Sequence, residues 1–77
     1  MDNNNLSLDF KKLGLKIAYY RKLNGLTQEK LAELLEVSTS YIGAIEAPNM
    51  DKPISLTTLF RIAAILNTPA WKFLKFD

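Results

Sequence analysis

Side chains that cap helices divide this chain into short segments. Thr27, Ser38 and Ser55 are residue types preferred at the N-cap, and each stands directly before a run with good helix propensity or helical apolar spacing. Thr68 precedes Pro69, and proline favours the first position of a helix. No segment shows a strand signal, so the chain is predicted to be all-α, with five helices.

The first helix is predicted from four apolar residues at helical spacing, namely Phe10, Leu13, Ile17 and Tyr20. A cap at Ser7 or Asp9 should begin it. Gly25 should end it, because glycine readily adopts the left-handed conformation favoured at helix C-termini. Residues 1–7 are expected to form a flexible leader, and residues 8–77 a single domain.

Four more helices should follow. The second is predicted over 28–35 and the third over 39–46. The fourth should begin after its cap Ser55 and end at Asn67, and the fifth should cover 70–74. A wide apolar stripe is predicted on the fourth helix, made of Leu56, Leu59, Phe60, Ile62, Ala63 and Leu66.

Residues 28–46 fit a helix-turn-helix, in which a short turn joins two short helices. Ala32 supplies the small residue needed where the helices cross, and Ile42 and Ile45 are among the apolar residues that can fill the angle between them. The turn usually requires glycine for a left-handed residue, whereas this chain has Glu36. The backbone at Glu36 should therefore be either strained or differently shaped.

The composition of the chain excludes several kinds of functional site. A chain of 77 residues holds one small core, and this one contains no cysteine and no histidine. Disulfides, Cys/His zinc sites, thiolate nucleophiles and imidazole bases are thereby excluded. Ser38, Ser40 and Ser55 have no histidine to activate them, and no cofactor motif is present. We expect no enzyme activity, no metal and no cofactor.

The chain carries no signal for a membrane or for export. Its start lacks a basic region followed by an apolar one, and the longest uncharged run near the C-terminus is about half the roughly 20 residues of a membrane helix. A cytoplasmic protein is the expectation.

Three blocks in this order resemble the lambda-repressor-like, or Xre-type, helix-turn-helix family of phage and bacterial regulators. The blocks are Arg21-Lys22-x-x-Gly25-Leu26-Thr27-Gln28-Glu29-x-Leu31-Ala32, Val37-Ser38-x-Ser40-x-Ile42-x-x-Ile45-Glu46 and Pro53-x-Ser55-Leu56-x-Thr58-Leu59-x-x-Ile62-Ala63. The resemblance implies five helices, binding of operator DNA as a homodimer, and control of transcription, with repression as the expected direction.

The third helix is the candidate DNA-reading element. Thr39, Ser40, Gly43 and Ala44 fall on the face opposite its apolar side. The resemblance implies that Thr39, Ser40 and Ala44 face the bases, with Tyr41 and Gly43 at the flank. This face has no Arg, Lys, Gln or Asn that could make bidentate hydrogen bonds to a base. Recognition of the DNA sequence by direct contacts to bases should therefore be modest. A merely solvated face, or one that packs on a protein, is the alternative.

Phosphate contacts are expected near the start of the second helix. Gln28 lies at the positive end of the helix dipole, next to its cap Thr27. The resemblance implies an ion pair between Arg21 and Glu46, from which Arg21 could still reach a phosphate. Lys52 is the only basic residue in the loop after the third helix. Related proteins often carry several basic residues there for phosphates, so this chain departs from that pattern. Solvated, unpaired side chains are the alternative.

The net charge of +2 is unevenly distributed. The first helix carries a basic run, made of Lys11, Lys12, Lys16, Arg21 and Lys22. This helix should either lie along the DNA backbone or simply be solvated.

Three aromatic residues crowd the C-terminus and are candidates for a dimer contact, namely Trp71, Phe73 and Phe76. Core closure by Trp71 and Leu74 is the alternative. For the whole protein, the second functional hypothesis is a protein-binding adaptor, such as an antitoxin-like partner.

Overall fold

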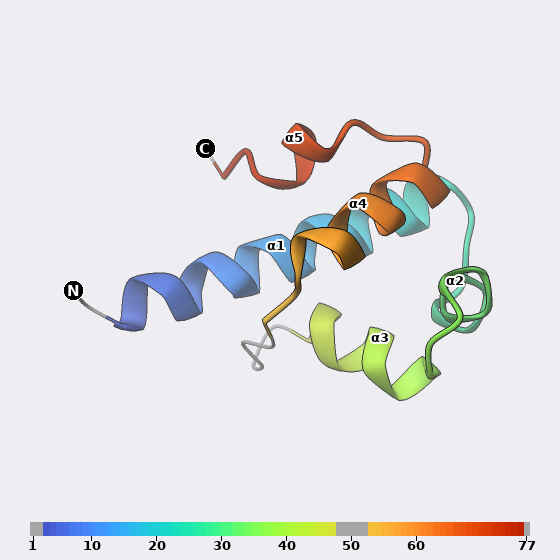
Figure 1. The fold of residues 1–77 in the computed structure, drawn as a ribbon, viewed down its shortest axis with the longest axis horizontal. Helices are drawn as coiled ribbons and strands as arrows, with labels where there is room; N and C mark the ends of the chain where they lie inside the picture. The colour runs from blue at the N-terminus through green and yellow to red at the C-terminus, as the bar shows by residue number, and fades with distance from the viewer. Residues whose placement is uncertain (1–2, 48–52, 77) are drawn as a thin grey trace.

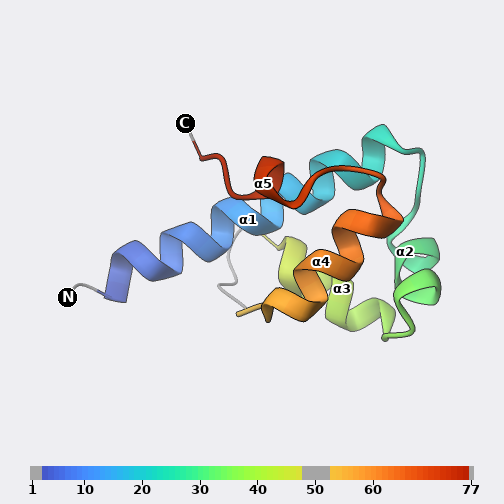
Figure 2. The same ribbon diagram turned by 45° about the horizontal axis from the view of Figure 1, so that its top comes forward.

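The computed structural model describes residues 3–47 and 53–76. In these ranges the chain forms five helices and no strand: α1 (Asn3–Leu23), α2 (Gln28–Leu35), α3 (Thr39–Glu46), α4 (Leu56–Ile65) and α5 (Ala70–Phe73). The predicted all-α fold is confirmed. Helix α1 runs along the long axis of the molecule, with α3 on one side of it and α5 on the other (Figures 1 and 2).

The predicted caps define α2, α3 and α4. The Thr27 hydroxyl oxygen accepts the backbone N–H of Lys30 at 3.0 Å, and the Ser38 hydroxyl oxygen accepts that of Tyr41 at 3.1 Å. The Ser55 hydroxyl oxygen accepts a backbone N–H three residues on, also at 3.1 Å. Each bond satisfies one donor that the first turn of a helix leaves free. Both helices of the predicted helix-turn-helix therefore have the expected bounds.

Two predicted helix boundaries are wrong. Helix α1 begins at Asn3, inside the expected leader, rather than after a cap at Ser7 or Asp9. Serine and aspartate cost only about 0.5 kcal/mol each inside a helix, so their preference for caps does not stop one.

Thr68 does not cap α5, because Pro69 occupies the N-cap position. The backbone N–H of Thr68 bonds to the Ala63 carbonyl at 3.0 Å, and its hydroxyl donates to the Leu66 carbonyl at 2.9 Å. Thr68 therefore completes the end of α4, where Asn67 adopts a left-handed conformation with φ of 51°.

The core lies between α1 and the other four helices. Its fully buried side chains include Ile17, Leu31, Leu35, Ile42, Ile45, Leu59, Ile62, Leu66 and Phe73. Two members of the predicted α4 stripe, Leu56 and Phe60, are exposed instead. The stripe was predicted too wide, because α4 packs along the side that carries Leu59, Ile62 and Leu66.

Helices α1 and α3 meet at a glycine that the sequence did not single out. A Cβ atom built on Gly14 would overlap the carbonyl oxygen of Ile45, a backbone atom of α3. Only a residue without a side chain permits this approach.

Glu36 lies in the turn of the helix-turn-helix with φ of 63° and ψ of 43°. This is the left-handed conformation, which costs a residue other than glycine roughly 1–2 kcal/mol. The turn therefore contains the left-handed residue expected in a helix-turn-helix, although this position holds Glu36 and not glycine. The following backbone N–H, of Val37, bonds to the Ala32 carbonyl at 3.0 Å and closes the end of α2.

Glu36→Gly is expected to raise the free energy of unfolding by about 1 kcal/mol, because glycine removes this strain while all backbone hydrogen bonds remain. Asn67→Gly is the matched control. Asn67 is also left-handed, but asparagine tolerates that conformation, so the gain there should be smaller. Urea unfolding of both variants measures the difference, and an equal or larger gain for Asn67→Gly would contradict the assignment of strain to Glu36.

Candidate nucleic-acid interface

Helix α3 presents small, uncharged side chains to the surface. Thr39 and Ser40 are exposed, whereas Tyr41, Gly43 and Ala44 are half-buried. The opposite side of α3 is fixed in the core by Ile42 and Ile45. The exposed face thus offers hydroxyl groups and methyl groups and no charge, as its sequence predicts.

A buried ion pair fixes the position of α3. Nε of Arg21 donates to Oε2 of Glu46 at 2.8 Å, and Nη2 donates to Oε1 at 2.9 Å. The third nitrogen, Nη1, donates to the carbonyl of Leu26 at 2.7 Å. Arg21 therefore ties α1 both to the last residue of α3 and to the segment leading into α2.

This geometry leaves Arg21 little freedom for another partner. Arg21 and Glu46 are each only 6% exposed, and all three guanidinium nitrogens already donate. The ion pair implied by the resemblance is present in the structure, whereas the phosphate contact expected of Arg21 does not fit its burial. Its role is structural.

Gln28 joins the same network from the start of α2. Its amide nitrogen donates to Oε1 of Glu46 at 3.1 Å. Its amide oxygen lies close to α3, since a Cβ atom built on Gly43 would be 3.8 Å from it. An amide nitrogen has two hydrogens, so one remains available beside the exposed face of α3. Thr27 stands next to it, and Lys52 lies outside the described residues.

The outer surface of α2 is acidic rather than basic. Glu29, Glu33 and Glu36 are exposed. Nζ of Lys30 donates to a carboxylate oxygen of Glu33 at 2.8 Å, and this hydrogen bond and the charge of Lys30 lower the pKa of Glu33. Such an exposed pair contributes little to stability.

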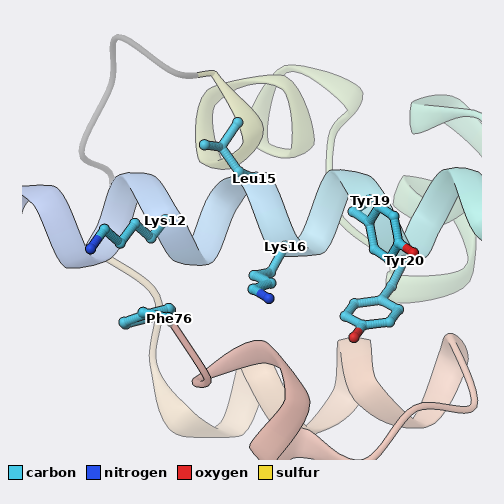
Figure 3. A pocket seen from close by; sticks show the side chains of 6 residues that line it. All are labelled: Lys12, Leu15, Lys16, Tyr19, Tyr20 and Phe76. Carbon is cyan, nitrogen blue, oxygen red and sulfur yellow. The ribbon is translucent and has the colours of Figure 1, made fainter.

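Two lysines of α1, Lys12 and Lys16, do not lie beside α3. At about 100° per residue, Lys12 and Lys16 lie on the side of α1 away from Gly14 and Arg21, which face α3. Figure 3 shows both lysines beside the C-terminal segment that carries Phe76. Lys12 and Lys16 therefore lie away from the candidate DNA-reading helix, and the contact of α1 with the DNA backbone stays a prediction. The position of each lysine in the helical repeat, and not the number of lysines in α1, decides which way its side chain points.

The aromatic residues of the C-terminus separate into different environments. Phe73 is fully buried and its ring meets that of Tyr20 edge-on, with centroids 5.1 Å apart. It cannot serve as the dimer contact predicted for it. The alternative prediction of core closure by Trp71 and Leu74 is also wrong, because Trp71 is 60% exposed and Leu74 is exposed as well. Helix α5 has only four residues, and of its side chains only that of Phe73 is fully buried in the core.

Arg61 has a role that the sequence did not reveal. Its Nη2 donates to the carbonyl of Leu35 at 2.8 Å, which links α4 to the last residue of α2. The only available signal was a charged residue beside the apolar stripe of α4, and this pattern does not identify the partner.

The described residues offer neither a metal-binding cluster nor a membrane-spanning helix. They contain no group of three or more acidic or metal-binding side chains that could hold a metal ion. None of their helices is long and apolar enough to cross a membrane.

Known proteins resemble this chain in sequence and in fold. A family model described as helix-turn-helix matches residues 17–70. Control protein C.SmaI of Serratia marcescens is 37% identical over 68 residues, which are 87% of this chain and 79% of that protein.

Two solved structures have the same fold. The restriction-modification controller protein C.AhdI from Aeromonas hydrophila superposes with a TM-score of 0.76 at 29% identity, over 84% of this chain and 96% of that one. SinR, a master regulator for biofilm formation solved in complex with DNA, gives a TM-score of 0.73 at 32% identity, over 82% of this chain and 98% of that one.

Proposed function

Because this chain belongs to the lambda-repressor-like helix-turn-helix family and is a DNA-binding transcriptional regulator, we propose that it binds operator DNA as a homodimer with α3 in the major groove. The observation that carries the proposal is the exposed face of α3, held in place by Arg21, Glu46 and Gln28. The family consists of regulators rather than enzymes, and we propose no catalytic activity.

The proposed roles follow from the exposed groups. Thr39 and Ser40 contact base edges through their hydroxyls, and the methyl groups of Thr39 and Ala44 suit a thymine methyl. The free hydrogen of the Gln28 amide donates to a phosphate at the N-terminus of α2, beside Thr27. With no bidentate donor on α3, much of the specificity comes from DNA shape.

The relatives suggest which genes are controlled. C.SmaI is a control protein and C.AhdI is a restriction-modification controller, so we place the operator beside restriction and modification genes. Repression is the proposed direction, since occupying a promoter requires nothing beyond binding itself.

A homodimer needs an apolar surface outside the core. The structure leaves Leu56 and Phe60 of α4 exposed, and we assign the dimer contact to them. Trp71 and Phe76, the remaining candidates from the sequence, border lysines of α1 and of the C-terminal segment. Pairing that charged surface with its own copy would bring like charges together, which disfavours it.

Selection of bound sequences from random DNA tests this function. A homodimer should select two related half-sites about 34 Å apart, one helical turn of DNA, and binding should weaken steeply as salt rises. Single half-sites, or binding that is insensitive to salt, would contradict the proposal.

Ser40→Glu should weaken binding to the selected site at least about 100-fold, because a carboxylate on α3 would repel phosphates and base acceptors. Leu8→Glu is the control, since Leu8 is also exposed and lies on the side of α1 away from α3 and outside the assigned dimer contact. Both substitutions place one added negative charge on an exposed position of a helix, so neither variant should lose stability. Fluorescence anisotropy with labelled DNA gives both affinities, and equal losses would argue against α3 as the reading element.

A further inference from the structure

Helix α1 carries an apolar stripe on the side away from α3. Leu8, Leu15, Tyr19 and Leu23 are all exposed, with Tyr19 at 57%. At about 100° per residue these four side chains share one side of the helix. They extend over about 22 Å at a rise of 1.5 Å per residue. Among the described residues, nothing covers this stripe.

The stripe borders a hollow between α1 and the C-terminal segment. The hollow has a volume of about 450 Å³ and is lined by Lys12, Leu15, Lys16, Tyr19, Tyr20 and Phe76. Figure 3 shows the side chains of Lys12, Lys16 and Tyr20 on the side of α1 that meets the C-terminal segment, with Leu15 on the far edge. We call the stripe and this hollow together the α1 groove.

Lysines lie both within and beside the α1 groove. At about 100° per residue, Lys12 falls among the apolar side chains of the stripe, Lys16 lies on the edge next to the C-terminal segment, and Lys11 and Lys22 lie on the other edge. Lys16 also borders a second hollow of about 290 Å³, whose lining includes Lys72 and Lys75 from the C-terminal segment. In the described part of α1 the only carboxylate is that of Asp9, and none of these six lysines forms an ion pair with a described residue.

We propose that the α1 groove binds an acidic amphipathic helix of a partner protein. The charge complementarity is the main argument, because an apolar surface that contains one lysine and is bordered by three more on α1 matches a helix with an apolar face edged by Asp and Glu. The exposed length of about 22 Å corresponds to a partner helix of about 15 residues. Leu15 and Tyr19 are the apolar anchors, and Lys12 and Lys16 pair with the partner's carboxylates.

Two other occupants fit less well. A second copy of this chain would bring its own lysines against these. Single-stranded nucleic acid needs free aromatic faces for stacking, yet the Tyr20 ring is in edge contact with Tyr19 and Phe73 at centroid distances of 4.9 and 5.1 Å. Nζ of Lys12 covers the ring of Phe76 at 6.0 Å.

The α1 groove also lies on the side of α1 opposite α3. A duplex held by α3 would leave the groove open to solvent, so the regulator can bind DNA and this partner together. The contact would bring a second protein to the operator without competing for it.

The test uses a fluorescein-labelled peptide of about 15 residues, with leucines at i, i+4, i+7 and i+11 and glutamates between them. It should bind the full-length protein saturably, with micromolar affinity. A second peptide with lysine in place of glutamate, and an oligothymidylate of similar length, should not bind.

Variants locate the site. Lys12→Gln/Lys16→Gln and Tyr19→Ala should each weaken peptide binding at least about tenfold, whereas Lys30→Gln, a lysine on α2, should have no effect. All three should keep wild-type affinity for DNA carrying the operator.

Failure of the acidic peptide to bind, or equal binding in the groove variants, would overturn the proposal. Binding of the oligothymidylate instead would mark the groove as a nucleic-acid site. A shift of either groove variant toward monomer in sedimentation equilibrium, without peptide binding to the wild type, would assign the groove to a second copy.

Discussion

Gly14→Ala is expected to lower the free energy of unfolding by about 2 kcal/mol or more, although alanine is the better helix former. Inside a helix, alanine gains about 1 kcal/mol over glycine. Here its methyl group would overlap the carbonyl oxygen of Ile45, and a backbone atom cannot rotate away as a side chain can. Helices α1 and α3 must then move apart, which loosens the packing of Ile17 and Ile42 between them.

Gly43→Ala provides the matched control for this variant. Gly43 is also a helical glycine, but its added methyl would meet only the Gln28 side chain at 3.8 Å, an ordinary contact distance. Its expected effect is a gain of about 1 kcal/mol. Urea unfolding followed by circular dichroism compares the two, and a stabilised Gly14→Ala would show that the two helices can separate at little cost.

Glu46→Leu is expected to cost about 3–5 kcal/mol, because it leaves the buried guanidinium of Arg21 with only the Leu26 carbonyl as partner. A domain of this size has a total stability of about 4–11 kcal/mol, so the variant should be near unfolding at 37 °C. Arg21→Met should cost a similar amount, since it leaves the Glu46 carboxylate with the Gln28 amide alone. Thermal unfolding of both variants measures these losses.

The double variant Arg21→Met/Glu46→Leu distinguishes the effect of the ion pair on stability from its effect on the position of α3. Replacing both partners with apolar side chains removes the unpaired charge, so the loss should be far smaller than the sum of the single losses. Gln28 would nevertheless lose its hold on α3, and DNA affinity should fall about tenfold in a protein that still folds. If the double variant lost as much free energy of unfolding as the two single variants together, the two residues would act independently.

Local chemistry explains why the helix-turn-helix could be placed from the sequence. Thr27 and Ser38 each bond to a backbone N–H three residues away, so the information that starts α2 and α3 lies within one turn. Helical spacing also identified Ile42 and Ile45 as the buried side of α3, and this left Thr39 and Ser40 on the outer face. The remaining assignments of base and phosphate contacts stay predictions.

Features that depend on distant segments could not be predicted in the same way. Gly14 lies against a backbone carbonyl of α3. No local sequence pattern distinguishes such a glycine from one on the exposed surface of a helix. The choice of Phe73 rather than Trp71 for the core depends on how α5 rests on Tyr20. The direction of Lys12 and Lys16 became clear only once the side of α1 that meets α3 was known.

Helix α1 also governs how the protein rotates in water. Its 21 residues span about 31 Å at 1.5 Å per residue, close to the full 36 Å length of a molecule that is 24 Å by 20 Å across. Amide N–H bonds in α1 therefore point along the axis that reorients most slowly, whereas those in α2, seen end-on in Figure 1, point across it. In a rigid monomer, the ratio of transverse to longitudinal nitrogen relaxation should be higher in α1 than in α2. A partner lying alongside α1 would make the molecule rounder and bring the two ratios together.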